Sequence, residues 1–387
     1  MEPSLMRKIL LLGASGSIGT QALDILEKEP TSFELVGISI GHQISKIPAI
    51  LKRFPTIKKV VVLEKEDKEK LEKEIPSVSF NYGEEGILSL VRLSDAEMVV
   101  NAIVGFAGLL PSLEALKQDK ILCLANKESL VVGGFFIRKL LSEGHGILYP
   151  IDSEHVALAK CLKAAPLNMV TELILTGSGG SFRNKKRNEL LHVTPLEALR
   201  HPTWKMGARI TIDCATMMNK GFEVIEAKEL FDFPLSKISI VLHDESEVHS
   251  LIKLRNGSYL ADIGRPDMHG PISYALHEEK EKANLVSFRS FDELKGLHFH
   301  PFDKERYPAV SLALEAASMP LGATCVLNAA DEEAVSLFLE GKIPFLDIEK
   351  IVSKAIHTLK KEIKTPLDLV ELDRETREYV RHLEEGK

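Results

Sequence analysis

Three acids in the middle of the chain are the residues best suited to chemistry. Asp152 and Glu154 follow a short apolar run that ends at Pro150, and Glu223 closes the segment Asn219 to Glu223, beside a lysine and an asparagine. Acids at positions i and i+2 of an extended chain point to one side, and hard oxygen ligands from two separate segments suit Mg²⁺ or Mn²⁺. The same Asp-x-Glu spacing is also typical of a cap or a surface pair, so spacing alone leaves both interpretations open.

Two polar loops lie between these acids. Thr176 to Ser181 reads Thr-Gly-Ser-Gly-Gly-Ser, and its hydroxyl and N–H groups are suited to cradling a phosphate. His201 to Gly207 contains Trp204, the only tryptophan of the chain. That tryptophan suits either a core anchor or a lid over a substrate.

A glycine turn near the N-terminus predicts a dinucleotide site. Gly13, Gly16 and Gly19 follow the apolar run Ile9 to Leu12 and precede Gln21 to Lys28, where apolar residues recur at helical spacing. The pattern is G-x-x-G-x-x-G rather than the commonest NAD fingerprint, G-x-G-x-x-G. A glycine turn between a strand and a helix brings backbone N–H groups close to a pyrophosphate. This position favours a dinucleotide site over a merely structural turn.

The end of the second expected strand indicates which dinucleotide binds. That strand covers Phe33 to Ile40 and is followed by Gly41, His42 and Gln43. NAD sites usually have an Asp or Glu here, which binds the ribose diol. Because no acid is present, and because His42 or Lys46 is available to contact a 2′-phosphate, the sequence favours NADP.

Strands that alternate with helical stretches predict an α/β fold. Further strands are expected at three places: Lys59 to Leu63, Met98 to Val104 and Lys120 to Leu124. The predicted architecture is an N-terminal Rossmann-like doubly wound sheet (residues 1–150), a central α+β catalytic domain (151–285), a connecting segment (286–307) and a C-terminal helical domain (308–387). On the C-terminal helices, Glu332 and Glu333 are expected on solvated faces.

Composition excludes several classes of protein. The chain has 387 residues, a formal net charge of −7 and 27% charged residues, which argues against a nucleic-acid partner. Its longest apolar stretch, Met98 to Leu113, is interrupted by asparagine, glycine and proline, so no membrane span is expected. Four widely spaced cysteines predict reduced thiols in a cytoplasmic protein, all buried except Cys214.

Six motifs together resemble one family. They occur in this order: Gly13 to Gly19, Leu124 to Leu130, Ile151 to His155, Leu175 to Gly180, His201 to Trp204 and Ala215 to Gly221. In this order they are similar to 1-deoxy-D-xylulose 5-phosphate reductoisomerases, and the resemblance extends into the helical tail. It implies an NADPH- and metal-dependent enzyme that rearranges and reduces 1-deoxy-D-xylulose 5-phosphate to 2-C-methyl-D-erythritol 4-phosphate, a precursor of isoprenoids in the non-mevalonate pathway. It also implies a homodimer.

The resemblance implies a role for each matching residue. The metal, Mg²⁺ or Mn²⁺ with Co²⁺ as an alternative, would be held by three catalytic acids: Asp152, Glu154 and Glu223. Lys127, also catalytic, and Ser153 would contact the substrate's oxygens. The substrate phosphate would be bound by Ser178, Asn219, Lys220 and the nearby His201, under a lid that carries Trp204 and Met206. NADPH would be held at these positions: Ser15, Gly16, Ser17, Ile18, Gly41, His42, Gln43, Asn126, Glu128 and Gly207.

Two departures from the family pattern stand out, and two other functions remain open. Cys214 stands where a phosphate-binding serine is common, and a thiol is the weaker donor. His42 and Gln43 replace a common Lys-Asn pair, which bears on the 2′-phosphate contacts.

One alternative function is a metal-independent NADP-dependent dehydrogenase of a sugar phosphate or semialdehyde, against which the three acids argue. The other alternative function is an NADP-sensing regulator, in which those three acids would have no role.

Overall fold

The computed structural model describes residues 6–204, 206–280, 290, 292 and 296–385. The chain divides into two compact units, each with its own sheet. The described residues within Met1–Ser129, Phe135–Asp152 and Asp267–Val286 form the first unit, and those within Leu130–Gly134, Ser153–Pro266 and Ser287–Lys387 form the second.

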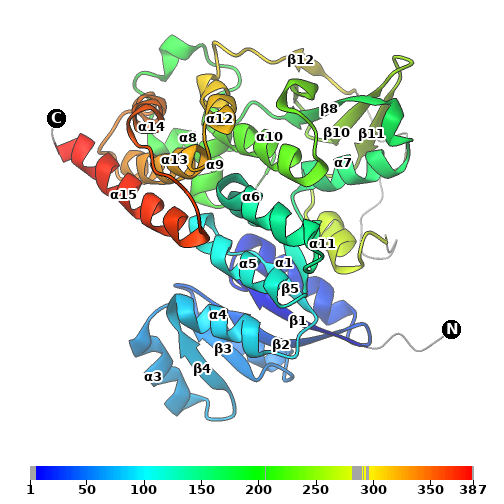
Figure 1. Ribbon diagram of the computed structural model, residues 1–387, viewed down its shortest axis with the longest axis vertical. Helices are drawn as coiled ribbons and strands as arrows, with labels where there is room; N and C mark the ends of the chain where they lie inside the picture. The colour runs from blue at the N-terminus through cyan, green and yellow to red at the C-terminus, as the bar shows by residue number, and fades with distance from the viewer. Residues whose placement is uncertain (1–5, 205, 281–289, 291, 293–295, 386–387) are drawn as a thin grey trace. The chain divides into compact units, whose positions relative to one another are not determined.

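The first unit is built on a seven-stranded parallel sheet with the order β4-β3-β2-β1-β5-β6-β7 (Figure 1). Its strands are β1 (Arg7–Leu12), β2 (Phe33–Ser39), β3 (Lys59–Val62), β4 (Ser79–Tyr82), β5 (Met98–Asn101), β6 (Ile121–Leu124) and β7 (Ile147–Pro150). Residues 9 to 12 of β1 are fully buried, so both faces of this central strand are covered, as is usual in parallel sheets. The strand order reverses at β1, which is where ligands bind in doubly wound folds.

Helices cover this sheet. They are α1 (Ser17–Lys28), α2 (Ile47–Arg53), α3 (Lys65–Glu74), α4 (Gly83–Leu93), α5 (Leu109–Lys117) and α11 (His269–Leu276), while α6 (Lys127–Ser142) contributes residues to both units. One core cluster joins β1, through Ile9 and Leu11, to Leu23 of α1 and Ile272 of α11. Residues of α11, far along the chain, therefore complete the core of the first unit.

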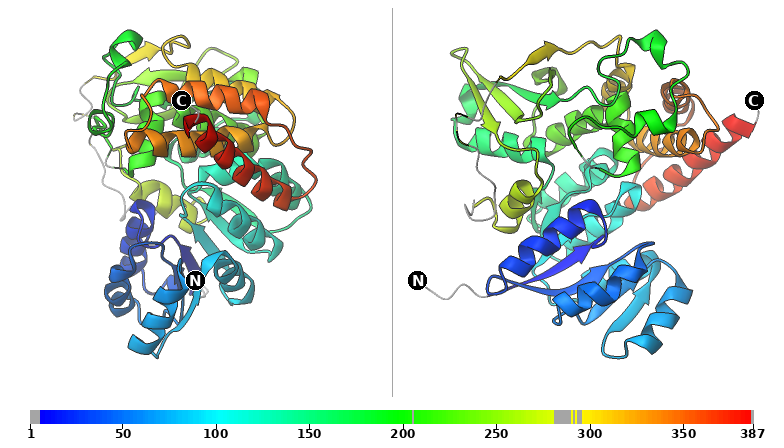
Figure 2. Two further views of the ribbon diagram at one scale, coloured as in Figure 1. Left: turned by 90° about the vertical axis from the view of Figure 1, so that its left-hand side faces the viewer. Right: turned by 180° about the vertical axis from the view of Figure 1, so that it is seen from behind.

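The second unit combines a mixed sheet with helices. The sheet has the order β11-β10-β8-β9-β12, and only β8 and β9 pair in parallel. Its strands are β8 (Val170–Gly177), β9 (Ile238–His243), β10 (Val248–Leu254), β11 (Tyr259–Ile263) and β12 (Phe299–Pro301). The helices are α7 (Ser153–Lys163), α8 (Pro195–Ala198), α9 (Ala208–Thr216), α10 (Met218–Phe231), α12 (Pro308–Ser318), α13 (Ala323–Leu339), α14 (Asp347–Thr358) and α15 (Pro366–Glu385). Figure 2 shows α13, α14 and α15, in orange to red, packed side by side.

The predicted fold class is confirmed, with differences at the ends of elements. Helix α1 begins at Ser17, four residues before the predicted start, because the glycine turn leads directly into it. Strand β5 ends at Asn101 rather than Val104. In the expected connecting segment, residues 286–289, 291 and 293–295 lie outside the described residues, and the described part contains β12, which pairs with β9. Among the described residues, no helix is long and apolar enough to cross a membrane.

Candidate active site

The glycine turn connects β1 to α1. Gly13 has φ +82°, and a Cβ there would lie 2.5 Å from the carbonyl oxygen of Ala102; a Cβ on Gly19 would lie 2.2 Å from the carbonyl oxygen of Gly13. No other residue fits at these two positions without moving the backbone. Gly16 meets nothing closer than 3.4 Å, so close packing within the protein does not demand this third glycine.

Among the described residues, no side chain caps the start of α1. Gly16 is the N-cap residue and makes no side-chain capping hydrogen bond to the N–H groups of the first turn. Ser17 is exposed, and Ser15 and Ile18 are half-buried. Lys46 adds a positive charge, since its Nζ donates to the carbonyl oxygen of Ser15 over 3.0 Å. The uncapped helix start, the helix dipole and this ammonium together favour an anion.

Other predicted cofactor residues also lie in the first unit. Gly41, His42 and Gln43 are exposed directly after β2. Asn126 is buried and caps α6: its side-chain oxygen accepts from the Ser129 N–H, and its amide donates to Glu128 Oε2 over 2.9 Å. The same amide donates to two backbone carbonyls that follow β5. Asn126 therefore also fixes the loop between β5 and α5.

Lys127 and Asp152 form a buried ion pair in the first unit. The Nζ of Lys127 donates to Asp152 Oδ2 over 2.6 Å, and the side chains are only 9% and 8% exposed. Lys127 is the first residue of α6, and Asp152 follows β7. Both therefore lie at the carboxyl ends of parallel strands, where α/β sheets place functional groups.

Glu154 and Glu223 lie on helices α7 and α10 of the second unit. The prediction of an extended chain from Asp152 to Glu154 is wrong, because α7 begins at Ser153 and Glu154 is its second residue. Lys220, one turn before Glu223 on α10, donates to Glu154 Oε1 over 3.0 Å and also to Glu223 Oε2. The other oxygen of Glu223 accepts from Asn219, and Ser153 Oγ donates to Glu154.

The three predicted acids come together in space. Asp152 ends the segment Phe135–Asp152 of the first unit and is bonded to Ser153, so the chain itself holds it at the start of α7. Carboxylate oxygens of Asp152, Glu154 and Glu223 lie within 4.8 Å of one another. Carboxylates this close repel one another unless cations lie among them. The arrangement suits a divalent cation that prefers oxygen ligands.

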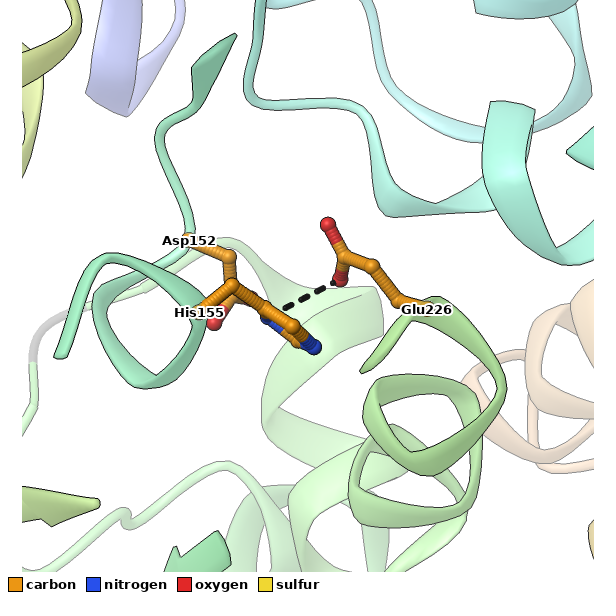
Figure 3. A group of neighbouring side chains, drawn as sticks. All are labelled: Asp152, His155 and Glu226. Atoms are coloured by element: carbon orange, nitrogen blue, oxygen red, sulfur yellow. Dashed lines mark ion pairs between the residues drawn. The ribbon is translucent and has the colours of Figure 1, made fainter. Parts of the chain in front are cut away.

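Sequence reasoning missed a buried His–Glu pair beside these acids. His155 Nδ1 lies 3.3 Å from Glu226 Oε2, and both side chains are at most 1% exposed (Figure 3). His155 Nε2 lies 2.9 Å from the backbone carbonyl of Glu223; because a carbonyl only accepts, this nitrogen carries the proton. Asp152, His155 and Glu226 also form a group with ligand atoms within 4.8 Å. The only sequence signal was position, since His155 follows Glu154 and Glu226 lies one turn after Glu223.

The predicted phosphate loop is packed tightly against α9 and α10. Gly180 has φ +71°, and a Cβ there would lie 2.2 Å from the carbonyl oxygen of Cys214, which is half-buried on α9. A Cβ on Gly177 would lie 3.2 Å from Lys220 Cε. The structure therefore brings together four of the predicted phosphate residues: Ser178, Cys214, Asn219 and Lys220. Met217, with φ +66°, both ends α9 and begins α10.

His201 joins this group as a neutral donor. Its Nδ1 accepts the backbone N–H groups of Thr203 (3.3 Å) and Trp204 (3.0 Å), so Nε2 carries the proton. Nε2 lies 3.1 Å from Ser178 Oγ. Burial first, and the positive charge of Arg183 second, lower the pKa of His201 to about 4. The ring is therefore uncharged at neutral pH.

The rest of the predicted lid lies close to this histidine in sequence. Trp204 is half-buried with its ring 6.5 Å from that of His249 on β10, and Met206 is also half-buried. Gly207 is the exposed N-cap residue of α9. Trp204 is thus not a core anchor: it covers the surface next to β10.

Comparison with known proteins decides the family. Residues 9–134 match the family model described as 1-deoxy-D-xylulose 5-phosphate reductoisomerase, and residues 148–231 and 263–379 match models of the C-terminal domains of the same enzyme. The chain belongs to the 1-deoxy-D-xylulose 5-phosphate reductoisomerase family. The reductoisomerase of Geobacillus sp. (strain WCH70) is 46% identical over 383 residues, which cover 98% of this chain and 100% of the relative. The reductoisomerase of Caldanaerobacter subterraneus is 44% identical over 379 residues, covering 97% and 98%.

Solved reductoisomerase structures share the fold. The Zymomonas mobilis enzyme in complex with NADPH matches with a TM-score of 0.90 and 35% identity, covering 99% of this chain and 100% of that one. A reductoisomerase in complex with NADPH, fosmidomycin and magnesium matches with a TM-score of 0.92 and 33% identity, covering 98% of each chain. Similarity over nearly the whole length extends the resemblance found in the motifs to the complete fold.

Proposed function

We propose that this chain catalyses the NADPH- and divalent-metal-dependent rearrangement and reduction of 1-deoxy-D-xylulose 5-phosphate to 2-C-methyl-D-erythritol 4-phosphate, a step toward isoprenoid precursors. The observation that carries the proposal is the group of Asp152, Glu154 and Glu223, with oxygens within 4.8 Å, beside two buried lysines. A dehydrogenase that works without metal has no use for three converging buried acids. Full-length membership of the reductoisomerase family supports the same reading.

The residues of the glycine turn fit NADPH. Ser15, Gly16, Ser17 and Ile18 surround a helix start without a side-chain cap, which is the kind of place where a pyrophosphate binds. Gly41, His42 and Gln43 are exposed at the end of β2, where an acid would repel a 2′-phosphate, and Lys46 adds a positive charge at the turn. We assign Asn126, Glu128 and Gly207 to the rest of this cofactor site. When bound, NADPH supplies the hydride for the reduction.

The three acids fit a divalent cation. Their donor set is made only of carboxylate oxygens, as Mg²⁺ and Mn²⁺ prefer, and we expect Mg²⁺, Mn²⁺ and Co²⁺ each to support activity. When bound, such a cation acts as a Lewis acid for the substrate's oxygens while a carbon–carbon bond is broken and remade. His155 and Glu226 lie beside this set, and the His155 hydrogen bond to the Glu223 backbone holds α10 against α7.

The protein's own residues orient the substrate. Lys220 contributes a point charge to the phosphate, and Ser178, Asn219 and the neutral Nε2–H of His201 contribute hydrogen bonds. The Cys214 thiol adds a weak donor. Lys127 and Ser153 lie beside the acids and contact the oxygens that rearrange. Trp204 and Met206 form the part of the lid that excludes water from the reacting groups.

The same proposal gives each predicted domain of the chain a function. Residues 1–150 bind NADPH, residues 151–285 hold the metal and the sugar phosphate, and residues 308–387 are the helical C-terminal domain reached through 286–307. We further propose a cytoplasmic homodimer whose ligands are small molecules rather than nucleic acids or membranes, consistent with its net charge of −7.

The proposal is tested by NADPH absorbance. Purified protein is expected to oxidise NADPH only when 1-deoxy-D-xylulose 5-phosphate and Mg²⁺ are both present, and activity without metal would favour the simple dehydrogenase instead. Glu223→Gln should lower kcat more than about a hundredfold, since even the partners of metal ligands are worth about 10- to 100-fold. Glu229→Gln, on the same helix, is the matched control. NADPH binding should survive in both variants, and Mn²⁺ binding, measured by electron paramagnetic resonance, should be lost only in Glu223→Gln.

A further inference from the structure

Helix α9 is attached to α13 by charged side chains that are buried or nearly so. Arg209 of α9 donates to Glu332 Oε1 over 2.9 Å and to Asn328 Oδ1 over 3.1 Å, both on α13. Arg377 of α15 donates to Glu332 Oε2 over 2.7 Å. The prediction that Glu332 and Glu333 are on solvated faces is therefore wrong: the Glu332 side chain is 14% exposed and lies between two guanidinium groups, and the Glu333 side chain is 12% exposed and pairs with Arg381.

Two acids also meet in this interface. Asp213 of α9 is 4% exposed and Asp331 of α13 is fully buried. Their carboxyl groups interact directly, and within the described part of the chain no nitrogen or hydroxyl donor reaches either oxygen of Asp331. Carboxylate oxygens only accept hydrogen bonds, so two carboxyl groups satisfy each other only when one of them carries a proton. Burial without such a bond would leave an unsatisfied group at a cost of about 1–3 kcal/mol.

The charges around Asp331 decide which state is stable. Arg209 and Asp213 face it from α9, with the Arg209 Nε 3.6 Å from Asp213 Oδ2, and Glu332 is the next residue on its own helix. From α15, Arg377 and Asp373 pair with each other and complete the group. An ionised Asp331 would set four buried negative charges against two positive ones. Burial first, and the charge of Asp213 second, raise the pKa of Asp331 well above its usual range.

This interface is coupled to the phosphate loop through α9. Asp213 directly precedes Cys214, whose carbonyl oxygen occupies the space that a Cβ on Gly180 would need. Three residues later Met217 ends α9 and starts α10, which carries Asn219 and Lys220. A shift of α9 relative to α13 would therefore displace the loop around Ser178 and the residues that follow.

We propose that Asp331 is a positioning residue: as a protonated carboxyl it donates a hydrogen bond to Asp213 and so holds α9, with the phosphate-binding residues that adjoin it, in place on α13. Its kinetic consequence rests on the proposed function, because it concerns binding of the substrate phosphate. Its structural content, a shared proton between two buried carboxyl groups, is independent of substrate.

Two substitutions with side chains of similar size distinguish the hydrogen bond that Asp331 donates from the space that its side chain fills. Asp331→Asn keeps a donor to Asp213, whereas Asp331→Leu fills the space without one. The KM for 1-deoxy-D-xylulose 5-phosphate should stay within about twofold of wild type in Asp331→Asn. In Asp331→Leu this KM should rise about tenfold or more, because one hydrogen bond to a charged group contributes a factor of about that size. The KM for NADPH should not change in either. Glu340→Gln, at an exposed acid directly after α13, is the control and should match wild type. An equal rise in Asp331→Asn and Asp331→Leu, or no rise in either, would overturn the proposal.

A measurement without substrate keeps the inference testable if Asp331→Leu fails to fold or the enzyme proves to act on another substrate. Infrared spectroscopy at neutral pH should show the carbonyl stretch of a protonated carboxyl in wild type and not in Asp331→Asn. Since the folded-state pKa of Asp331 lies above its unfolded value, the wild-type melting temperature should fall relative to that of Asp331→Asn as the pH rises above about 4, the ordinary pKa of an aspartate. A wild-type spectrum without this band would refute the shared proton, whatever the substrate is.

Discussion

Gly180→Ala offers a direct test of how closely the phosphate loop must approach α9. The wild-type residue has φ +71°, a region that costs alanine about 1–2 kcal/mol. A Cβ there would also lie 2.2 Å from the carbonyl oxygen of Cys214, whereas carbon–oxygen contacts are normally about 3.3 Å or longer. The loop and α9 must therefore separate by about 1 Å, which adds about 1–3 kcal/mol of overpacking. We expect a total loss of about 2–5 kcal/mol in the free energy of unfolding.

Gly257→Ala is the matched control for backbone strain. Gly257 has φ +86°, and a Cβ there would meet nothing within 4 Å. This variant should lose only the backbone cost of about 1–2 kcal/mol and keep its kinetic constants. The difference between the two variants isolates the close approach of Gly180 to Cys214.

Function should separate the two glycines more sharply than stability does. A displacement of about 1 Å at a site that orients substrate costs on the order of a hundredfold in rate, so Gly180→Ala should lower kcat/KM for 1-deoxy-D-xylulose 5-phosphate by about 10- to 100-fold. The assays are urea unfolding and NADPH oxidation, with the KM for NADPH as an internal control. If Gly180→Ala and Gly257→Ala prove equal in both assays, the contact between the loop and α9 does not position the phosphate site.

Three further substitutions test the charges and donors of the site. Lys220→Met should destabilise the metal-free protein by about 3–5 kcal/mol, because Glu154 and Glu223 lose their buried partner; Mg²⁺ should then raise its melting temperature more than that of wild type. Wild type should lose about 1–2 kcal/mol of unfolding free energy, after allowance for solvent screening, as the pH falls from about 6.5 toward 4. The cause is the lowered pKa of about 4 of His201, which keeps the folded ring neutral while the unfolded ring takes up a proton. His201→Gln should not show this loss when its urea unfolding is measured across the same pH range. Cys214→Ser should lower the KM for the sugar phosphate about two- to tenfold by adding a stronger donor, and an unchanged KM would place residue 214 away from the phosphate.

The first unit could be predicted closely because its signals are local. A continuous apolar strand such as Ile9 to Leu12, followed by glycines and a helix, has few other stable arrangements, and both of its faces are indeed covered. The glycine turn was predictable for the same reason. Some ends of elements were misplaced, such as the start of α1 at Ser17, strand β4 was not predicted, and the return of α11 to this unit was not foreseen.

The second unit was harder because its decisive contacts are distant in sequence. The acids Asp152, Glu154 and Glu223 were named correctly as a group, but for the wrong local reason, since Glu154 lies on a helix rather than an extended chain. Glu332 was misjudged because Arg209, its partner, lies 123 residues away. His155 and Glu226 were overlooked because each is unremarkable until α7 and α10 pack together. Periodicity predicts which residues share an element, but not which elements meet.

Under the proposed function, the charges of the candidate site explain how it would accommodate both a cation and an anion. Asp152, Glu154 and Glu223 carry three negative charges and Lys127 and Lys220 two positive ones, so these five side chains, counted without the neighbouring His155 and Glu226, have an excess of one negative charge. A bound divalent cation would change the net charge from −1 to +1, which favours binding of a phosphate dianion. The bound dianion would return the net charge to −1, which favours binding of the cation. Under the proposed function, each ligand offsets the imbalance that the other leaves, so we expect binding of either to strengthen binding of the other. Lys220 is central to this coupling, because it reaches Glu154 and Glu223 from the same turn of α10 that adjoins the phosphate loop.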